Sequence, residues 1–273
     1  MKCASSPGKE VVRICSTATR LMGNWVRAVG VTLTILACVF AGSVSGTDLR
    51  VVAPNAVKEV VSDAAARYER ATGNRTVVTW SGSEAIAKRV GDGEVFDVVL
   101  NTPRNLDALA EAGKIVLGTR VDFAKSGIGV AARTGQPRPD VSNDDALRKV
   151  LLEAKSIGIS SGPSGRYLTE LFQRLGIAAQ VQGKIRQPPS GAQIAELLAR
   201  GEVEIGFQQI SELQHAGGVE YLGPLPTGLQ SYTIWSGGLH TAASDAAAGR
   251  TFLNTLLSPD LATAIRKAGM DPM

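Results

Sequence analysis

The sequence has few cysteines and histidines, and this scarcity limits the chemistry it can perform. All three cysteines, Cys3, Cys15 and Cys38, lie within the first 46 residues, so the chain beyond them has no thiol for a disulfide, a thiolate metal site or a nucleophile. Its two histidines, His215 and His240, lack a second metal-ligating residue at helical or ribbon spacing. We therefore expect no metal site, no cofactor and no thiol chemistry.

A basic surface is also missing once the N-terminal segment is set aside. The whole chain has 29 basic and 25 acidic residues, but five of the basic ones and one acidic residue lie within residues 1–46. The remainder carries 24 of each, and no run of lysine and arginine is interleaved with aromatic residues. Nucleic-acid binding needs such a positive patch, so we expect no nucleic-acid partner.

Residues 1–46 have the pattern of an export signal. Arg27 precedes an uncharged apolar run, residues 28–41, and small residues follow at 42–46. The run is shorter than the ~20 apolar residues that a membrane span needs. We expect a signal peptide over residues 1–46, with Met22 as the true start, and a periplasmic location. The alternative is a lipoprotein anchored through Cys38, whose preceding residues faintly resemble a lipoprotein box.

Beyond residue 48, strand patterns alternate with helical patterns. Strands are expected at 49–53, 76–80, 96–100, 127–132, 156–160, 203–208, 218–222 and 233–239. Helices are expected at 56–72, 83–90, 105–112, 144–154, 165–175, 193–200, 245–257 and 259–268. This alternation is typical of an α/β protein with an open, mainly parallel sheet and helices on both faces.

Four turns that lead into helices are small, polar or rich in glycine, at 53–56, 81–84, 160–166 and 188–193. Helix starts carry unpaired N–H groups and a partial positive charge, and small residues let an anion approach them. Each turn alone is explained by helix capping, with Ser83 and Ser164 as N-caps and Ser190 at capping-box spacing from Gln193. Taken together, the four turns predict an anion site.

The order of these segments resembles the type II periplasmic binding proteins, and within them the molybdate-binding proteins of ABC importers. The similarity extends over roughly residues 49–272 and is carried by the segments 51–53, 81–97, 162–167 and 205–209. It implies two lobes, each a mainly parallel sheet flanked by helices, joined by a hinge. Lobe 1 would comprise residues 48–128 plus 226–273, and lobe 2 residues 129–225.

The resemblance further implies an extracytoplasmic substrate-binding component that captures a small, molybdate-like oxyanion between the lobes and delivers it to an ABC permease. Nothing in the sequence points beyond a monomer. The family's ligand-contact positions correspond here to Ala56, Ser83, Ser164, Gly191 and Gln209. Four neighbours complete the predicted ligand-binding set: Asn55, Ser81, Gly165 and Arg166.

This sequence departs from the family pattern at three of these places. Ala56 stands where the family has a serine and Gln209 where it has a tyrosine, and Arg166 is an added cation. An arginine fork suits a planar carboxylate, so a small organic acid is the alternative ligand. The other interpretation is that Arg166 is an exposed residue pointing to solvent.

Two other function classes compete with solute binding. A secreted hydrolase would need a base beside one of the serines, with only two histidines to supply it. A ligand-sensing domain of a regulator is disfavoured by the export signal and by the missing DNA-binding segment.

Overall fold

A computed structural model describes residues 48–273. The expected signal peptide, the start at Met22 and the lipoprotein alternative at Cys38 lie outside the described residues. Among the helices of residues 48–273, none has the length and apolar character needed to cross a membrane.

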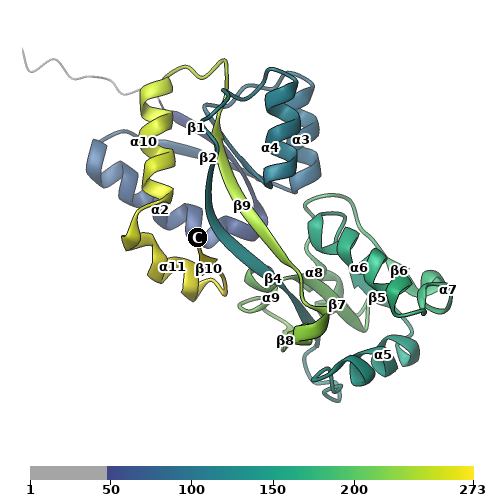
Figure 1. The fold of residues 1–273 in the computed structure, drawn as a ribbon. Coiled ribbons are helices and arrows are strands. Elements are labelled where there is room, and N and C mark those ends of the chain that lie inside the picture. The colour runs from purple at the N-terminus through teal and green to yellow at the C-terminus, as the bar shows by residue number, and fades with distance from the viewer. Residues whose placement is uncertain (1–47) are drawn as a thin grey trace, which may run out of the picture. The chain divides into compact units, whose positions relative to one another are not determined.

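The described chain forms two α/β lobes that are bridged by long strands (Figure 1). The first lobe begins with β1 (Leu49–Pro54), the 3-10 turn η1 (Asn55–Val57), α2 (Lys58–Thr72), β2 (Thr76–Ser81), α3 (Ser83–Gly91), β3 (Val98–Asn101) and α4 (Pro103–Glu111). Strand β4 (Val121–Arg133) then leads into the second lobe.

The second lobe contains α5 (Asp144–Glu153), β5 (Ile157–Ile159), α6 (Pro163–Arg174), α7 (Ala178–Val181), η2 (Gln182–Lys184), β6 (Ile185–Arg186), α8 (Ile194–Ala199), β7 (Ile205–Gln209), α9 (Ile210–Leu213), β8 (Val219–Pro224) and η3 (Thr227–Leu229). Strand β9 (Tyr232–Leu239) returns to the first lobe, which is completed by α10 (Ala246–Leu256), η4 (Pro259–Leu261), α11 (Ala262–Lys267) and β10 (Asp271–Pro272).

The two-lobed α/β fold is confirmed, and the sheet as a whole is mixed. Strands β1, β2 and β3 pair in parallel in the first lobe, as do β5, β6 and β7 in the second. The crossing strands β4 and β9 pair antiparallel with each other and with β7 and β3 respectively. Parallel neighbours need a crossover connection, which the helices between the strands of each lobe supply. Strands β4 and β9, in contrast, run directly between the lobes.

The bridge between the lobes is continuous strand rather than loose linker. Residues Val121–Gly127 of β4 pair with β9, and Ile128–Ala132 of the same strand pair with β7. At the change of partner, the side chain of Gln230 accepts from the Ile128 N–H at 2.8 Å and donates to the Ile128 carbonyl at 3.0 Å. This amide replaces a missing strand neighbour at the place where a hinge would bend.

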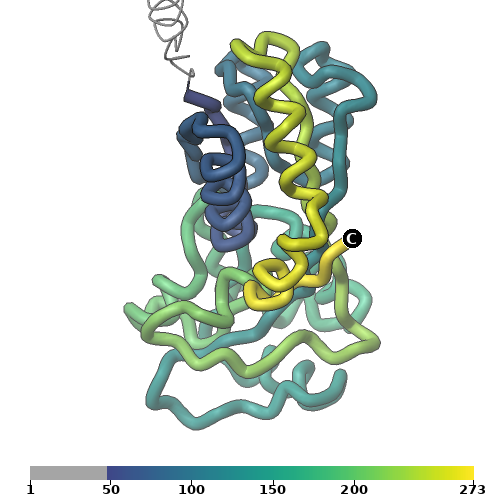
Figure 2. Tube along the Cα trace, turned by 90° about the vertical axis from the view of Figure 1, so that its left-hand side faces the viewer, coloured from purple at the N-terminus to yellow at the C-terminus, as the bar shows by residue number. Residues whose placement is uncertain are grey.

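Each lobe has its own apolar core. In the first lobe α2, α10 and α11 cover one face of the strands and α3 and α4 cover the other (Figures 1 and 2). The helical spacing predicted for α2 is confirmed, since Val60, Val61, Ala64 and Tyr68 are all buried. The second core lies around Phe172 and Phe207 and draws its residues from positions 128–229.

Several boundaries differ from the sequence prediction, and the short elements were missed. Helix α6 begins two residues earlier than expected, at Pro163, where proline is well suited to the first helical position. The sequence patterns also did not reveal α7, β6, α9 or β10, which are at most four residues long and therefore show no periodicity.

Candidate anion site between the lobes

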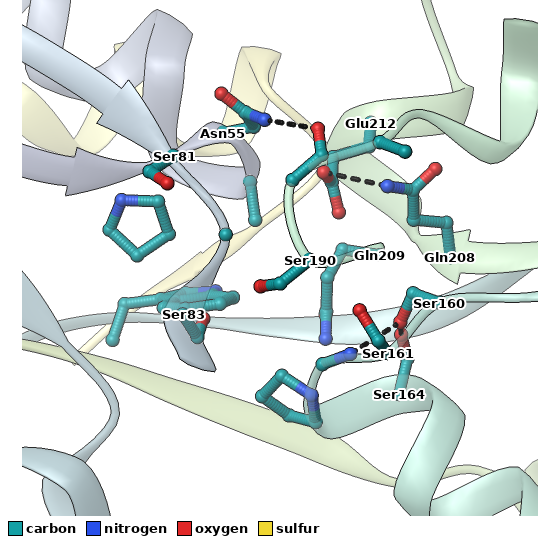
Figure 3. A pocket seen from close by; sticks show the side chains of 18 residues that line it. Asn55, Ser81, Ser83, Ser160, Ser161, Ser164, Ser190, Gln208, Gln209 and Glu212 are labelled. Atoms are coloured by element: carbon teal, nitrogen blue, oxygen red, sulfur yellow. Dashed lines mark hydrogen bonds between the residues drawn. The ribbon is translucent and has the colours of Figure 1, made fainter. Parts of the chain in front are cut away.

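The four turns singled out in the sequence lie around one cavity between the lobes (Figure 3). Its volume is about 40 Å³. A single water needs about 10–15 Å³ by the same kind of measure, so the space suits a few waters or one small anionic group. The wall is formed by Pro54, Asn55, Ala56, Ser81, Gly82, Ser83, Ser160, Ser161, Gly162, Pro163, Ser164, Ser190, Gly191, Ala192, Gln208, Gln209, Glu212 and Trp235.

Helix α3 begins at the cavity without a cap from its own chain segment. Its N-cap residue is Gly82, which has no side chain to accept from the first turn. Instead the Ala85 N–H donates to Ser190 Oγ of the second lobe at 3.3 Å. Ser83 is buried, and its carbonyl accepts from Asn101 Nδ2 at 2.9 Å, which fixes the start of the helix. The second lobe therefore completes a helix of the first.

Helix α6 brings a second uncapped N-terminus to the same cavity. Gly162 is its N-cap residue, again without a side-chain acceptor. Ser160 and Ser164 share a hydrogen bond between their hydroxyls at 2.8 Å, and Ser160 Oγ also accepts from the Gly162 N–H. A β-carbon on Gly165 would lie 1.6 Å from the Ser160 carbonyl oxygen, so glycine is required there for the helix to approach the end of β5.

Direct hydrogen bonds hold the lobes together beside the cavity. Asn55 Nδ2 donates to the Gly191 carbonyl at 3.0 Å, and Ser211 Oγ donates to the Ala56 carbonyl at 2.7 Å. Gly82 lies so close to the opposite turn that a β-carbon on it would be 2.2 Å from Ser190 Oγ. The structure is therefore a closed conformation.

Gln209 lies on the wall with its amide already engaged. Its side chain contacts Thr233 Oγ1 at 2.9 Å. In the orientation that satisfies both amide atoms, the oxygen accepts from that hydroxyl and the NH₂ group points to Ser126 at 3.2 Å. Gln209 thus ties β7 to β9 and β4 at the bottom of the cavity.

Trp235 of β9 supplies a donor that the sequence analysis missed. The side chain is 1 % exposed and lines the cavity, yet its Nε1–H has no hydrogen-bond partner within the described structure. Leaving a buried donor unsatisfied costs about 1–3 kcal/mol. An acceptor atom in the cavity would remove this penalty.

Glu212 of α9 is the one acidic residue on the wall, and it too was missed. Its Oε1 accepts from Gln208 Nε2 at 2.8 Å, as Figure 3 shows, and from Gln193 Nε2 at 3.4 Å. Surrounding protein raises the pKa of Glu212 to about 7, against the opposing effect of these hydrogen bonds. Because it faces the cavity it keeps some accessible surface.

Arg166 does not reach the cavity wall. Its guanidinium forms an ion pair with Glu84, which lies on α3 of the opposite lobe, and both side chains are a little over one-third exposed. The pair connects the two helices that begin at the cavity. Arg166 is therefore part of the contact between the lobes in this conformation.

Seven of the nine predicted ligand-binding residues line the cavity: Asn55, Ala56, Ser81, Ser83, Ser164, Gly191 and Gln209. The other two, Gly165 and Arg166, lie just outside it. Neither Trp235 nor Glu212 carries a sequence signal for this role, since both depend on strands or helices brought together from distant parts of the chain.

The histidines lie elsewhere. His215 is exposed and contacts the Lys267 carbonyl, and His240 is buried, where desolvation lowers its pKa. Asp97 accepts from backbone N–H groups of Arg50 and Ser244, as expected for a strand-end residue. Residues 48–273 contain no cluster of three metal-ligating side chains. A serine nucleophile at the cavity would thus have no histidine beside it among the wall residues.

Comparison with known proteins gives a consistent picture of the fold. The chain is 34% identical over 233 residues to an aconitate isomerase of a Pseudomonas species, which covers 83% of this chain and 88% of the relative. It is 26% identical to a molybdate-binding protein of Rhodobacter capsulatus, covering 82% and 88%. The periplasmic molybdate-binding protein of Azotobacter vinelandii has the same fold, with a TM-score of 0.70 at 19% identity over 82% of this chain and 98% of that one.

A model of one family matches residues 49–271, nearly all of the described chain. The chain belongs to the bacterial extracellular solute-binding proteins.

Proposed function

We propose that this protein captures a small anion in the interlobe cavity and presents it, unchanged, to an ABC permease at the membrane. The lobes would be residues 48–128 plus 226–273 and residues 129–225, closing about the hinge at Gln230. The periplasm is the proposed location, and the proposed form is a monomer.

The observation that supports this most strongly is the unsatisfied Trp235 N–H beside two helix starts whose N-cap residues are glycines without a side-chain cap. The described wall contains no lysine or arginine. Neutral donors can hold a dehydrated anion, because a hydrogen bond to a charged group contributes about 1.5–3 kcal/mol and one helix end about 0.3–1 kcal/mol.

The cavity size and a described wall without lysine or arginine favour a molybdate-like oxyanion. A small organic carboxylate is the alternative, and the 34% identity to an aconitate isomerase supports it. Calorimetric titration of the purified protein with molybdate, tungstate, sulfate, citrate, cis-aconitate and trans-aconitate would separate these ligands. Failure of every anion to bind would contradict the proposal.

Replacing Trp235 by phenylalanine should weaken capture of the preferred anion by about 10–100-fold, because one hydrogen bond to a charged group is lost. Calorimetry gives the affinity directly. The matched control is Trp80→Phe, since Trp80 lies outside the cavity wall. Equal affinities for wild type and Trp235→Phe would show that the Trp235 N–H does not bind the anion.

Replacing Arg166 by alanine distinguishes the two ligand classes. For an oxyanion we expect at most about a fivefold loss of affinity, because the pair with Glu84 is half-exposed and such pairs contribute about 0–1 kcal/mol. A loss of roughly 100-fold for carboxylates alone would instead indicate that Arg166 leaves Glu84 and binds the ligand. Arg174→Ala, on the far end of the same helix, is the control.

A second candidate function is isomerisation of a small unsaturated acid such as aconitate. It is favoured by the 34% identical relative and by Glu212, because a group that titrates near neutral pH can remove and return a proton. Incubation with cis-aconitate, followed by chromatography for the trans isomer, tests it. Turnover that disappears in Glu212→Gln would support catalysis, and absence of turnover with intact binding would support capture alone.

A further inference from the structure

The carboxyl group of Glu212 lies between two spaces. It forms part of the cavity wall, and it also borders an adjoining outer hollow of about 550 Å³, which shares Asn55, Ala56 and Gly191 with that wall. Its Oε1 is held by Gln208 and Gln193. The backbone of Gln209 also hydrogen-bonds to the carboxyl group, and Figure 3 shows this group directed into the pocket. The group is therefore positioned to contact whatever occupies the cavity.

Within residues 48–273, Glu212 forms no ion pair, and its hydrogen-bond partners are neutral amides. The charged or titratable groups on the neighbouring elements line the outer hollow: Lys58 and Glu59 of α2, Glu196 of α8, and His215 just beyond α9. An ionised Glu212 would thus place a second negative charge beside a bound anion.

We propose that Glu212 carries a proton whenever an anion occupies the cavity, so that capture of the anion takes up one proton. A protonated carboxyl has an O–H donor, which adds one hydrogen bond to the ligand. An ionised one has only acceptors and repels the ligand. The residue therefore selects ligands that accept a hydrogen bond at this point, and it links affinity to pH.

The outer hollow supplies the route for the proton. In the closed conformation, Gly82 and Asn55 contact the opposite turn beside the cavity. Glu212 still borders the outer hollow in this conformation. Burial places the pKa of the ligand-free carboxyl near neutrality, at about 7, so an anion in the cavity need only raise it further.

This inference rests on the proposed function, because it concerns the same cavity. The test is calorimetric titration of the purified protein with molybdate and, separately, with trans-aconitate at pH 8, in buffers of different ionisation enthalpy. The dependence of the observed heat on the buffer gives the number of protons exchanged. We expect uptake of nearly one proton per anion, and a tenfold loss of affinity per pH unit above about pH 7.5.

Three variants sharpen the test. Glu212→Gln keeps the shape and a donor but cannot ionise, so it should bind without proton uptake, with an affinity that is independent of pH and higher than that of wild type at pH 8.5. His215→Asn removes the histidine that borders the outer hollow, and it should leave the uptake unchanged. So should Glu170→Gln on the exposed side of α6.

The possible results separate a failure of the proton-uptake proposal from a failure of the proposed anion-binding function. Anion binding without proton uptake, or uptake that persists in Glu212→Gln, would overturn the inference and leave the proposed function standing. Uptake that disappears in His215→Asn would also overturn it. If neither anion binds at any pH, the proposed function fails and the inference fails with it.

Discussion

Replacing Gly82 by alanine should weaken anion capture by roughly 100-fold while leaving the unfolding temperature almost unchanged. The backbone of Gly82 is ordinary extended chain, with φ −86° and ψ 152°, so alanine fits the first lobe without strain. In the closed protein, however, the new β-carbon would lie 2.2 Å from Ser190 Oγ and 2.4 Å from the Gly191 nitrogen. Alanine therefore opposes closing rather than folding.

The size of the effect follows from the closed population. A ligand that binds only the closed form loses affinity in proportion to the fraction of molecules that can close. Calorimetry with the preferred anion measures that loss, and thermal unfolding of the ligand-free protein measures the stability. Gly91→Ala, at the other end of the same helix, is the control, because its β-carbon would meet nothing nearer than Leu109 at 4.0 Å. Unchanged affinity in Gly82→Ala would show that ligand binds without this closure.

The second large effect concerns stability. Glu212→Gln should stabilise the protein above pH 7 by up to about 3 kcal/mol. The pKa of Glu212 is raised from 4.5 to about 7 in the folded state, so the folded protein keeps a proton that the unfolded chain has lost. Wild-type stability must then fall as pH rises from about 4.5 to 7 and stay low above that. The glutamine side chain stays neutral throughout and can still accept from Gln208.

Urea unfolding of the ligand-free protein at pH 5 and pH 8 tests this difference. At pH 5 the two proteins should be of similar stability, and at pH 8 the variant should be more stable. Glu170→Gln is the control, because Glu170 is exposed on α6. Equal pH dependence in wild type and Glu212→Gln would mean that the carboxyl is ionised in the folded protein at neutral pH.

The regular elements could be predicted because their sequence patterns are long enough to show a period. Helix α2 buries the same positions that its apolar spacing identifies. The two lobes followed from the family resemblance rather than from periodicity. The antiparallel pairing of β4 could not be foreseen, because its apolar residues are compatible with either direction and only the crossover between lobes decides it.

The turns around the cavity could be predicted from the sequence, but the contributions of the Trp235 and Glu212 side chains could not. Small residues at helix starts mark a local feature, which a sequence shows directly. In the sequence, Trp235 has the pattern of an ordinary core residue of a strand. Its unsatisfied N–H can be recognised only in the folded structure, where β9 lies beside the turns. Likewise, the pKa shift of Glu212 depends on burial by distant segments. For Arg166, the partner Glu84 lies 82 residues away on the other lobe.

A crystal structure of the protein grown with the tightest-binding anion of the calorimetric panel would test anion capture most directly. We expect the anion between the lobes, with an oxygen within hydrogen-bond distance of Trp235 Nε1 and of the N–H groups that open α3 and α6. An anion held outside the cavity by Arg166, or an empty cavity in a protein that binds the anion in solution, would contradict capture by neutral donors.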